Sequence, residues 1–259
     1  MLKRIIGVIT VKDNWVVQSI GYKKYRPIGK INVVLENLDR WQLEEILVVD
    51  INRSKNDLGP NFELLDSIVN EKIATPLAYA GGIRNSEDAV KVINAGADRI
   101  GLERLFDSNP DEFLKVSGSI GCQAVILMQA LTFHCDDIYK YCYISGKSFK
   151  LTKNYYNEYQ DFFSEMMVID YINEGHPNSF NENLPIQLEI DKQIICFGGV
   201  STATQIKNLF RLQNVSAVGI GNFLNYKELA NWQLVKNVKL GSNRRLTYGK
   251  QSRGIMEWH

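Results

Sequence analysis

Short apolar runs rich in β-branched residues alternate with amphipathic segments along most of this chain. Such runs are typical of buried strands, and apolar residues that recur every three or four positions are typical of helices packed on them. The predicted strands cover residues 4–11, 45–51, 76–80, 99–102, 123–127, 165–170, 193–197 and 217–220. The predicted helices cover residues 31–41, 62–71, 86–95, 110–117, 202–212 and 226–235.

This alternation of strands and helices predicts the fold class. Eight strands, each followed by a helical segment within about 240 residues, fit a closed parallel (β/α)8 barrel better than an open sheet. No segment rich in proline and glycine divides the chain, so we expect one α/β TIM-barrel domain over residues 1–240. Residues 241–259 lack an apolar period and carry four Lys or Arg residues and a histidine, which predicts a flexible C-terminal tail.

A repeated glycine pair divides the predicted barrel into two similar halves near residue 120. One apolar strand ends in Gly81-Gly82 and another ends in Gly198-Gly199, and each is followed by a helical stretch and a second strand containing glycine. Glycine lets the backbone approach a ligand closely, and the amides at a helix start can hold an anion. An alternative is that these glycines only form tight strand-to-helix turns. The predicted phosphate-binding positions are Gly81, Gly82, Gly198, Gly199, Gly219 and Gly221.

Composition excludes several classes of partner. Of the 259 residues, 45% are hydrophobic, which is enough for a large core. The 30 basic and 29 acidic residues give a formal charge of +1, which favours neither nucleic acid nor an anionic membrane. Neither a charged-then-apolar leader nor an apolar run of about 18 residues is present, so we expect a cytoplasmic protein without a membrane segment.

Cysteine and histidine are few and poorly spaced for metal binding. The four cysteines show no C-x-x-C spacing, which predicts reduced thiols, and the chain has three histidines. The cluster 134–137 contains one histidine, one cysteine and two aspartates, but its members are too adjacent to hold one ion. We interpret it as part of a surface hairpin over 131–154, turning at Ser145-Gly146-Lys147, and expect neither a metal nor a cofactor.

Four segments of the chain resemble one known protein family. The opening residues 1–8, the segment 44–51 (EEILVVDI), the Gly81-Gly82-Ile83 turn and the segment 95–99 (AGADR) resemble the cyclase subunit of imidazole glycerol phosphate synthase. The resemblance covers residues 1–235. It implies a barrel that takes ammonia from a glutaminase partner and adds it to a doubly phosphorylated, nucleotide-like substrate.

The resemblance also identifies what the chain has lost. Family members use two aspartates as general acid and base, at the ends of the first and fifth strands, and the matching positions here are Thr10 and Ala130. A further acidic position falls on Ile172. Where the family has small polar residues after the fourth strand, this chain has Glu103-Arg104, and Glu103 would repel a phosphate unless Arg104 or Arg84 offsets it.

The amino ends of the strands retain the family's pattern. Arg4, Glu45, Arg99 and Glu165 begin four strands at positions where inward-facing charges would ring the lower mouth of the barrel and pair with one another. In the family, four charges of the same type form the gate through which ammonia enters. An alternative is that such a ring simply closes the bottom of the barrel. Two further positions, Asp98 and Gln123, match the rim that faces the glutaminase.

One further segment concerns the substrate, and three large residues concern the passage of ammonia through the barrel. The segment 13–30 carries Tyr22, Lys23, Lys24, Tyr25 and Arg26, and could be a lid over a phosphate or sugar ligand or a basic docking face. Part of it, 25–32, resembles a branch of the family associated with bacterial surface-polysaccharide genes, in which the barrel passes ammonia to an amide- or amidine-forming enzyme acting on a sugar nucleotide. Candidate residues for a plug of the interior are Tyr79, Met128 and Phe197.

These observations favour a barrel subunit that receives ammonia from a glutaminase and passes it to a third enzyme or to an altered, phosphorylated substrate. A working cyclase subunit in histidine biosynthesis, with displaced acid and base groups, is one alternative. A non-catalytic scaffold with a closed interior is the other.

Overall fold

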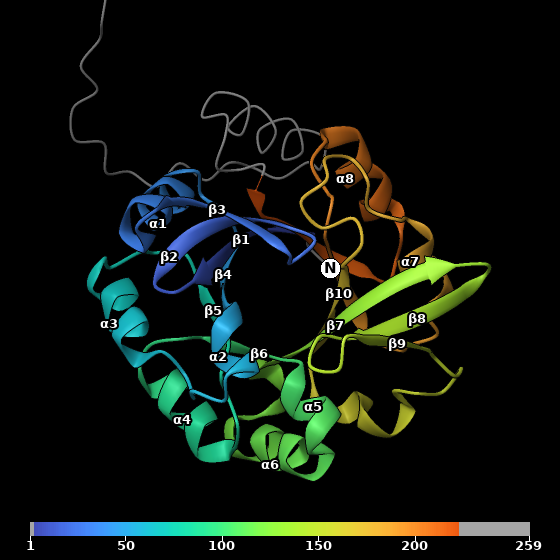
Figure 1. Cartoon of the computed structure of the whole chain (residues 1–259), viewed down its shortest axis with the longest axis horizontal. Helices are drawn as coiled ribbons and strands as arrows, with labels where there is room; N and C mark the ends of the chain where they lie inside the picture. The colour runs from blue at the N-terminus through green and yellow to red at the C-terminus, as the bar shows by residue number, and fades with distance from the viewer. Residues whose placement is uncertain (1–2, 223–259) are drawn as a thin grey trace, which may run out of the picture.

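The computed structural model describes residues 3–222, and eight parallel strands in it form a closed barrel surrounded by helices (Figure 1). The predicted helix 226–235 and the predicted tail 241–259 lie outside the described residues. The barrel strands are β1 (Arg4–Lys12), β4 (Glu45–Asp50), β5 (Leu77–Ala80), β6 (Arg99–Leu102), β7 (Val125–His134), β10 (Glu165–Asp170), β11 (Gln193–Phe197) and β12 (Val215–Ile220).

Pairing between β7 and β10 closes the barrel, because the other neighbours already run in the order β10, β11, β12, β1, β4, β5, β6, β7. This confirms the predicted (β/α)8 fold. The fifth strand differs from the prediction: residues 122–124 form a 3-10 turn, and β7 then continues to His134. The helices are α1 (Ile31–Arg40), α2 (Ile51–Lys55), α3 (Phe62–Asn70), α4 (Ser86–Asn94), α5 (Arg104–Ser108), α6 (Pro110–Ile120), α7 (Asn183–Gln187) and α8 (Ala203–Arg211), with a 3-10 helix at Asn157–Phe162.

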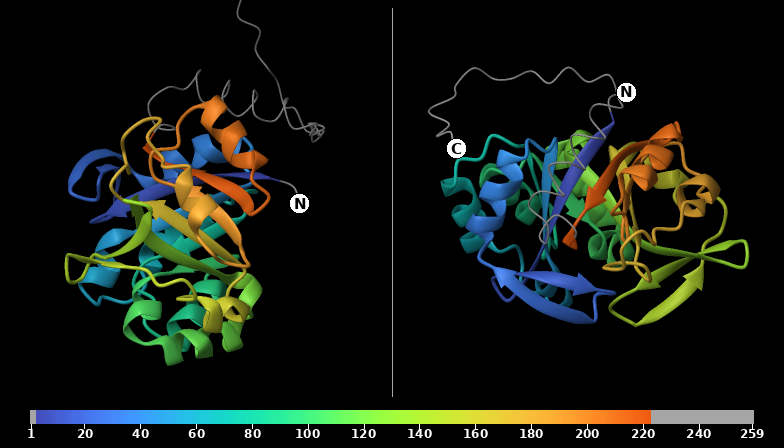
Figure 2. Two further views of the ribbon diagram at one scale, coloured as in Figure 1. Left: turned by 90° about the vertical axis from the view of Figure 1, so that its right-hand side faces the viewer. Right: turned by 90° about the horizontal axis from the view of Figure 1, so that it is seen from above.

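Two β-hairpins project from the same end of the barrel, the end at which the barrel strands finish (Figure 2). The first consists of β2 (Trp15–Ile20) and β3 (Lys24–Gly29), so the segment 13–30 is an ordered antiparallel pair. The second consists of β8 (Asp137–Cys142) and β9 (Lys147–Lys150), with β8 also paired to the extended end of β7. This confirms the predicted hairpin and its turn at Gly146, where φ is +68°.

The alternation of side chains along each strand separates two apolar cores. Ile5 and Ile9 of β1 face the surrounding helices, whereas Ile6 and Val8 face the barrel interior. The interior core continues through Leu47, Ala78, Ala80, Ile126, Met128, Met167, Ile169, Ile195, Phe197 and Ala217. Met128 and Phe197 therefore lie inside the barrel, as a plug requires.

Tyr79 cannot be such a plug, because it belongs to the outer core. Its hydroxyl accepts a hydrogen bond from the backbone N–H of Asn61 at 2.9 Å, on the helix side of β5. The sequence shows a large aromatic residue in a barrel strand, but only the register assigns it to the outer face.

The half-barrel repeat extends beyond the glycine pairs. Asp50 ends β4 and Asp170 ends β10, and each accepts a hydrogen bond from an asparagine eleven positions later, Asn61 and Asn181. The carbonyl oxygens of Asp50 and Asp170 in turn lie where a Cβ atom on Gly81 or Gly198 would stand. In both halves, the first glycine of the pair is therefore required by the close approach of the preceding strand.

Candidate functional site

Four charged residues form a closed ring at the lower end of the barrel. Arg4 donates to Glu165 at 2.5 Å and lies 3.8 Å from Glu45, and Arg99 bridges the same two carboxylates at 2.9 and 3.1 Å. Because all four residues begin their strands and point inward, their charges alternate around the mouth. The structure thus brings together all four residues that the sequence places at this end.

Burial and pairing act against each other in this ring. The side chains of Glu45 and Glu165 are 6% and 9% exposed, and those of Arg99 and Arg4 are 16% and 27% exposed. Burial raises the pKa of Glu45 even though both arginines are close. Burial also opposes ionisation of Glu165, but Arg4, a hydrogen bond from Ser216 and Arg99 together lower its pKa.

The two predicted partner-facing residues lie beside this ring. Asp98 is exposed immediately before β6, where it accepts a hydrogen bond from the backbone N–H of Leu77 at 2.8 Å. Gln123 is exposed in the 3-10 turn before β7. Both positions are therefore accessible at the lower rim.

A cavity of about 1070 Å³ opens at the other end of the barrel, under the two hairpins. Tyr22 and Tyr25 approach it from the first hairpin, and Tyr141 and Tyr143 approach it from the second. Tyr141 also stacks on Tyr171 with ring centroids 4.5 Å apart. Further lining residues that carry charge are Lys12, Lys23, Lys24, Asp50, Lys55, Glu103 and Arg104. The upper cavity therefore has tyrosine walls and a basic border.

Ala130 lines this upper cavity and Thr10 lines a smaller one next to it, so the two positions that the resemblance matches to the acid–base pair both face the mouth. The matching acidic position Ile172 is 54% exposed. Glu103 contacts position 130 directly, because its Oε1 accepts a hydrogen bond from the Ala130 N–H at 3.3 Å. The sequence marks Glu103 as a departure from the family but does not show that it reaches across to β7.

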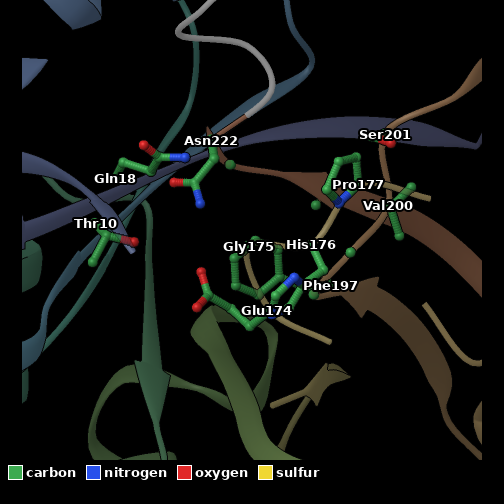
Figure 3. Close-up of a pocket in the computed structure, with 14 residues that line it drawn as sticks. Thr10, Gln18, Glu174, Gly175, His176, Pro177, Phe197, Val200, Ser201 and Asn222 are labelled. Carbon is green, nitrogen blue, oxygen red and sulfur yellow. The ribbon is translucent and has the colours of Figure 1, made fainter. Parts of the chain in front are cut away.

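The smaller cavity, of about 170 Å³, lies over the second glycine pair (Figure 3). Figure 3 shows Thr10 and Gln18 to one side of the opening, with Pro177 and Val200 to the other. Gly198, Gly199, Gly219, Gly221, Ser201 and Asn222 complete much of its lining. Four of the six predicted phosphate-binding glycines therefore meet at one opening.

Glu174 also faces this smaller cavity, and sequence reasoning gave it no role. Its carboxylate accepts hydrogen bonds from the Ser19 hydroxyl at 3.0 Å and from the Tyr22 N–H at 3.2 Å. These bonds join the loop after β10 to the first hairpin. Burial raises the pKa of Glu174, and the hydrogen bonds from Ser19 and Tyr22 partly oppose that shift.

In the first half of the barrel, other parts of the chain contact the matching glycine pair, Gly81-Gly82. The Gly82 N–H donates to the Ser54 hydroxyl at 2.9 Å, and the carbonyl of Gly59 lies where a Gly82 Cβ would stand. Arg84 binds Asp88, and Arg104 binds the Ser54 carbonyl and Asp57, so internal acceptors engage both arginines. Gly81, Gly101, Ser54 and Arg104 in this half also line the upper cavity, so both glycine pairs adjoin an opening.

The segment 134–137 forms the turn between β7 and β8, with positive φ at Cys135 and Asp136. Within residues 3–222, no group of three or more histidine, cysteine or acidic side chains is arranged to hold a metal ion. Over the same residues, no helix is long and apolar enough to cross a membrane.

Comparison with known proteins places this geometry in a family. A model described as "Histidine biosynthesis protein" matches residues 4–230. The chain belongs to the histidine biosynthesis protein family. The imidazole glycerol phosphate synthase subunit HisF of Staphylococcus saprophyticus is 26% identical over 245 residues, which cover 92% of this chain and 97% of that protein.

Other relatives of this histidine biosynthesis family member match over a shorter length. A subunit of Vibrio vulnificus, provisionally named imidazole glycerol phosphate synthase subunit hisF2, is 33% identical over 149 residues, 57% of this chain and 54% of that protein. A hisF2 subunit of Campylobacter jejuni, also named provisionally, is 31% identical over 127 residues, 49% and 50% of the two chains. The chain thus spans about half the length of these two hisF2 relatives. These relatives and the family match confirm the resemblance to the cyclase subunit.

Proposed function

We propose that this chain is the barrel subunit of a glutamine-dependent amidotransferase. A glutaminase binds at the lower rim, ammonia enters through the ring of Arg4, Glu45, Arg99 and Glu165, and nitrogen leaves at the upper mouth. Its acceptor is a phosphorylated small molecule. In the surface-polysaccharide branch that residues 25–32 resemble, the acceptor is a sugar nucleotide handled by an amide- or amidine-forming enzyme.

The observation that carries this proposal is a contrast between the two ends of the barrel. The ring of charges at the lower end is complete, whereas the two acid–base positions at the upper mouth have no carboxyl. All four ring charges are present and paired. Above them the interior core is apolar from Ile6 to Phe197, an environment that disfavours ammonium and favours neutral ammonia because it offers no solvation for a charge. Thr10 and Ala130, at the two acid–base positions, cannot exchange a proton near neutral pH.

The smaller cavity supports a phosphorylated acceptor. Its glycine-rich lining leaves backbone close to any ligand, and it adjoins α8, whose N-cap is Thr202.

A binding experiment tests the lower end. The probe is the glutaminase subunit of an imidazole glycerol phosphate synthase, titrated against the full chain, Gln123→Arg and Ser145→Arg. Because Gln123 lies at the lower rim and Ser145 lies in a turn at the upper end, the same cation is placed at opposite ends of the barrel. We expect Gln123→Arg to weaken binding about tenfold or more and Ser145→Arg to leave it unchanged. Equal binding by all three proteins, or none by the full chain, would contradict the proposal.

A further inference from the structure

The upper cavity contains a carboxyl group that the family's acid–base positions do not account for. Glu103 directly follows β6 at the N-cap position of α5, where its side chain makes no capping hydrogen bond, and it lines the cavity. Its Oε1 accepts a hydrogen bond from the backbone N–H of Ala130 at 3.3 Å, on the neighbouring strand β7. The carboxyl therefore stands beside the strand end where the side chain at position 130 is only a methyl group.

We propose that Glu103 is the acid–base residue of the upper cavity, where it exchanges a proton with the carbonyl-bearing, phosphorylated ligand that accepts ammonia. This inference deepens the proposed function, on which it rests for the arrival of ammonia at this end. It assigns the chemistry to the barrel's own mouth, with Glu103 supplying from β6 one of the two carboxyls that β1 and β7 lack.

The charge of Lys140 acts on Glu103, but Lys140 forms its ion pair with another carboxyl. Lys140 of β8 is 1% exposed, and its ammonium binds Asp107, one turn after Glu103 on α5. The ammonium also lies over the rings of Phe106 and Tyr155, at 5.1 and 5.5 Å from their centroids. Lys140 is thus held by a group other than Glu103.

Three phenols also lie near Glu103. Tyr22 comes from the first hairpin, Tyr143 from the second and Tyr156 from the segment before the 3-10 helix, and burial raises the pKa of all three, so each is neutral near pH 7. Burial, followed by the charge of Asp107, raises the pKa of Glu103 to about 8, against the opposing effects of Lys140 and the Ala130 N–H. Glu103 therefore carries a proton at neutral pH.

A protonated Glu103 suits both the ligand and the reaction. A neutral acid does not repel a phosphorylated ligand, which removes the conflict that an ionised Glu103 would create. A carboxyl whose ionisation its surroundings oppose also costs stability at high pH, as expected of a group that serves chemistry.

Glu103 alone can donate and regain the proton that the addition of ammonia to a carbonyl requires. The nitrogen lone pair of ammonia attacks the carbonyl carbon, a C–N bond forms, and the electron pair of the C=O π bond moves to oxygen. That oxygen takes the proton of Glu103, and the resulting carboxylate then takes a proton from the positively charged nitrogen. The product is a carbinolamine, and Glu103 ends protonated as it began.

Cyclase turnover in a repaired background tests the inference without any glutaminase. Ammonium salt and the cyclase family's doubly phosphorylated substrate are supplied to Thr10→Asp, which restores the first-strand carboxylate only. We expect measurable turnover, a loss of about a hundredfold or more on adding Glu103→Gln, and partial recovery with Glu103→Asp. The limb of the pH–rate profile near pH 8 should disappear with Glu103→Gln. The exposed Glu87→Gln on α4 is the matched control, and it should leave turnover unchanged.

Two results would overturn the inference. One is equal turnover by Thr10→Asp with and without Glu103→Gln. The other is turnover by Thr10→Asp/Ala130→Asp but none by Thr10→Asp alone. If no variant turns over, infrared difference spectra of the full chain decide: a protonated carboxyl band at pH 7 that Glu103→Gln removes supports the inference, and its absence refutes it. A failure of the proposed function itself is distinct, because it appears as loss of glutaminase binding.

Discussion

At the lower end of the barrel, each of four inward-facing charges is paired with an opposite charge. At the upper end, the carboxyl of Glu103 accepts a hydrogen bond from a backbone amide and forms no ion pair within residues 3–222. The lower ring consists of the residues that the cyclase resemblance implies. At the upper mouth, Thr10 and Ala130 stand where the resemblance implies two carboxylates, and Glu103 lies beside Ala130. This difference underlies our proposal that the barrel retains a partner-facing port while its chemistry end has diverged. Opposite ends of parallel strands share no side chains, so the two ends can change independently.

The largest expected effect comes from restoring the upper mouth to the family pattern. Thr10→Asp/Ala130→Asp should bring cyclase turnover with ammonium from background to a measurable rate, a gain of about a hundredfold or more, because acid–base catalysis typically contributes that much. Product formation from the doubly phosphorylated substrate measures it. If the substrate binds to the double variant and no product forms, the upper mouth has diverged beyond these two positions.

Removing one cation from the ring should produce the next largest effect. Arg99→Met leaves Glu45 and Glu165 with less compensation in a buried site, so we expect the free energy of unfolding to fall by about 3 kcal/mol. Urea unfolding at pH 7 measures the change. The control is Lys91→Met, which breaks an exposed pair with Glu87 and should cost less than about 0.5 kcal/mol. Equal costs for the two variants would mean that the ring is not a buried network.

A smaller effect should test whether the smaller cavity binds phosphate. Gly221 faces the smaller cavity, and an added Cβ would come within 3.3 Å of the Phe197 ring without meeting backbone closer than 3.6 Å. Gly221→Asp should therefore fold and weaken binding of inorganic phosphate about tenfold, by about 1.4 kcal/mol, through like-charge repulsion. Calorimetric titration gives the affinity. Gly118→Asp on α6 adds the same charge where a Cβ meets nothing, and unchanged affinity in both variants would argue against this cavity as the phosphate site.

The last expected effect concerns how the free energy of unfolding changes with pH. Because the pKa of Glu103 is raised from 4.5 to about 8, the folded chain retains a proton that the unfolded chain releases between these values. The stability contributed by this proton is therefore complete below pH 4.5 and lost as pH rises towards 8. Relative to the wild type, Glu103→Gln should therefore become progressively more stable across this window. Thermal unfolding at pH 5 and pH 8 measures the gain, and a difference that stays constant with pH would exclude a raised pKa.

The sequence predicts the barrel and the ring because both depend on local patterns. Strand alternation assigns Arg4 and Glu45 to the interior once the strand boundaries are known, and the order of the strands then brings the four charges together. Long-range contacts defeat the same reasoning at the other end. The bond from Ala130 to Glu103 joins neighbouring strands, the contact of Lys140 with Asp107 joins a hairpin to a helix, and the periodicity of the sequence encodes neither. Tyr79 shows the remaining weakness, since a shift of one residue in register exchanges the inner and outer faces.

Cyclase turnover by the unmodified chain, with the doubly phosphorylated substrate and excess ammonium salt, tests the contrast between the two ends most directly. This assay needs no glutaminase and examines only the upper mouth. The account predicts no turnover above background, because Thr10 and Ala130 leave the mouth with one acid where the reaction needs an acid and a base. Turnover on the order of 1 per second would contradict it and assign the chain to working cyclases.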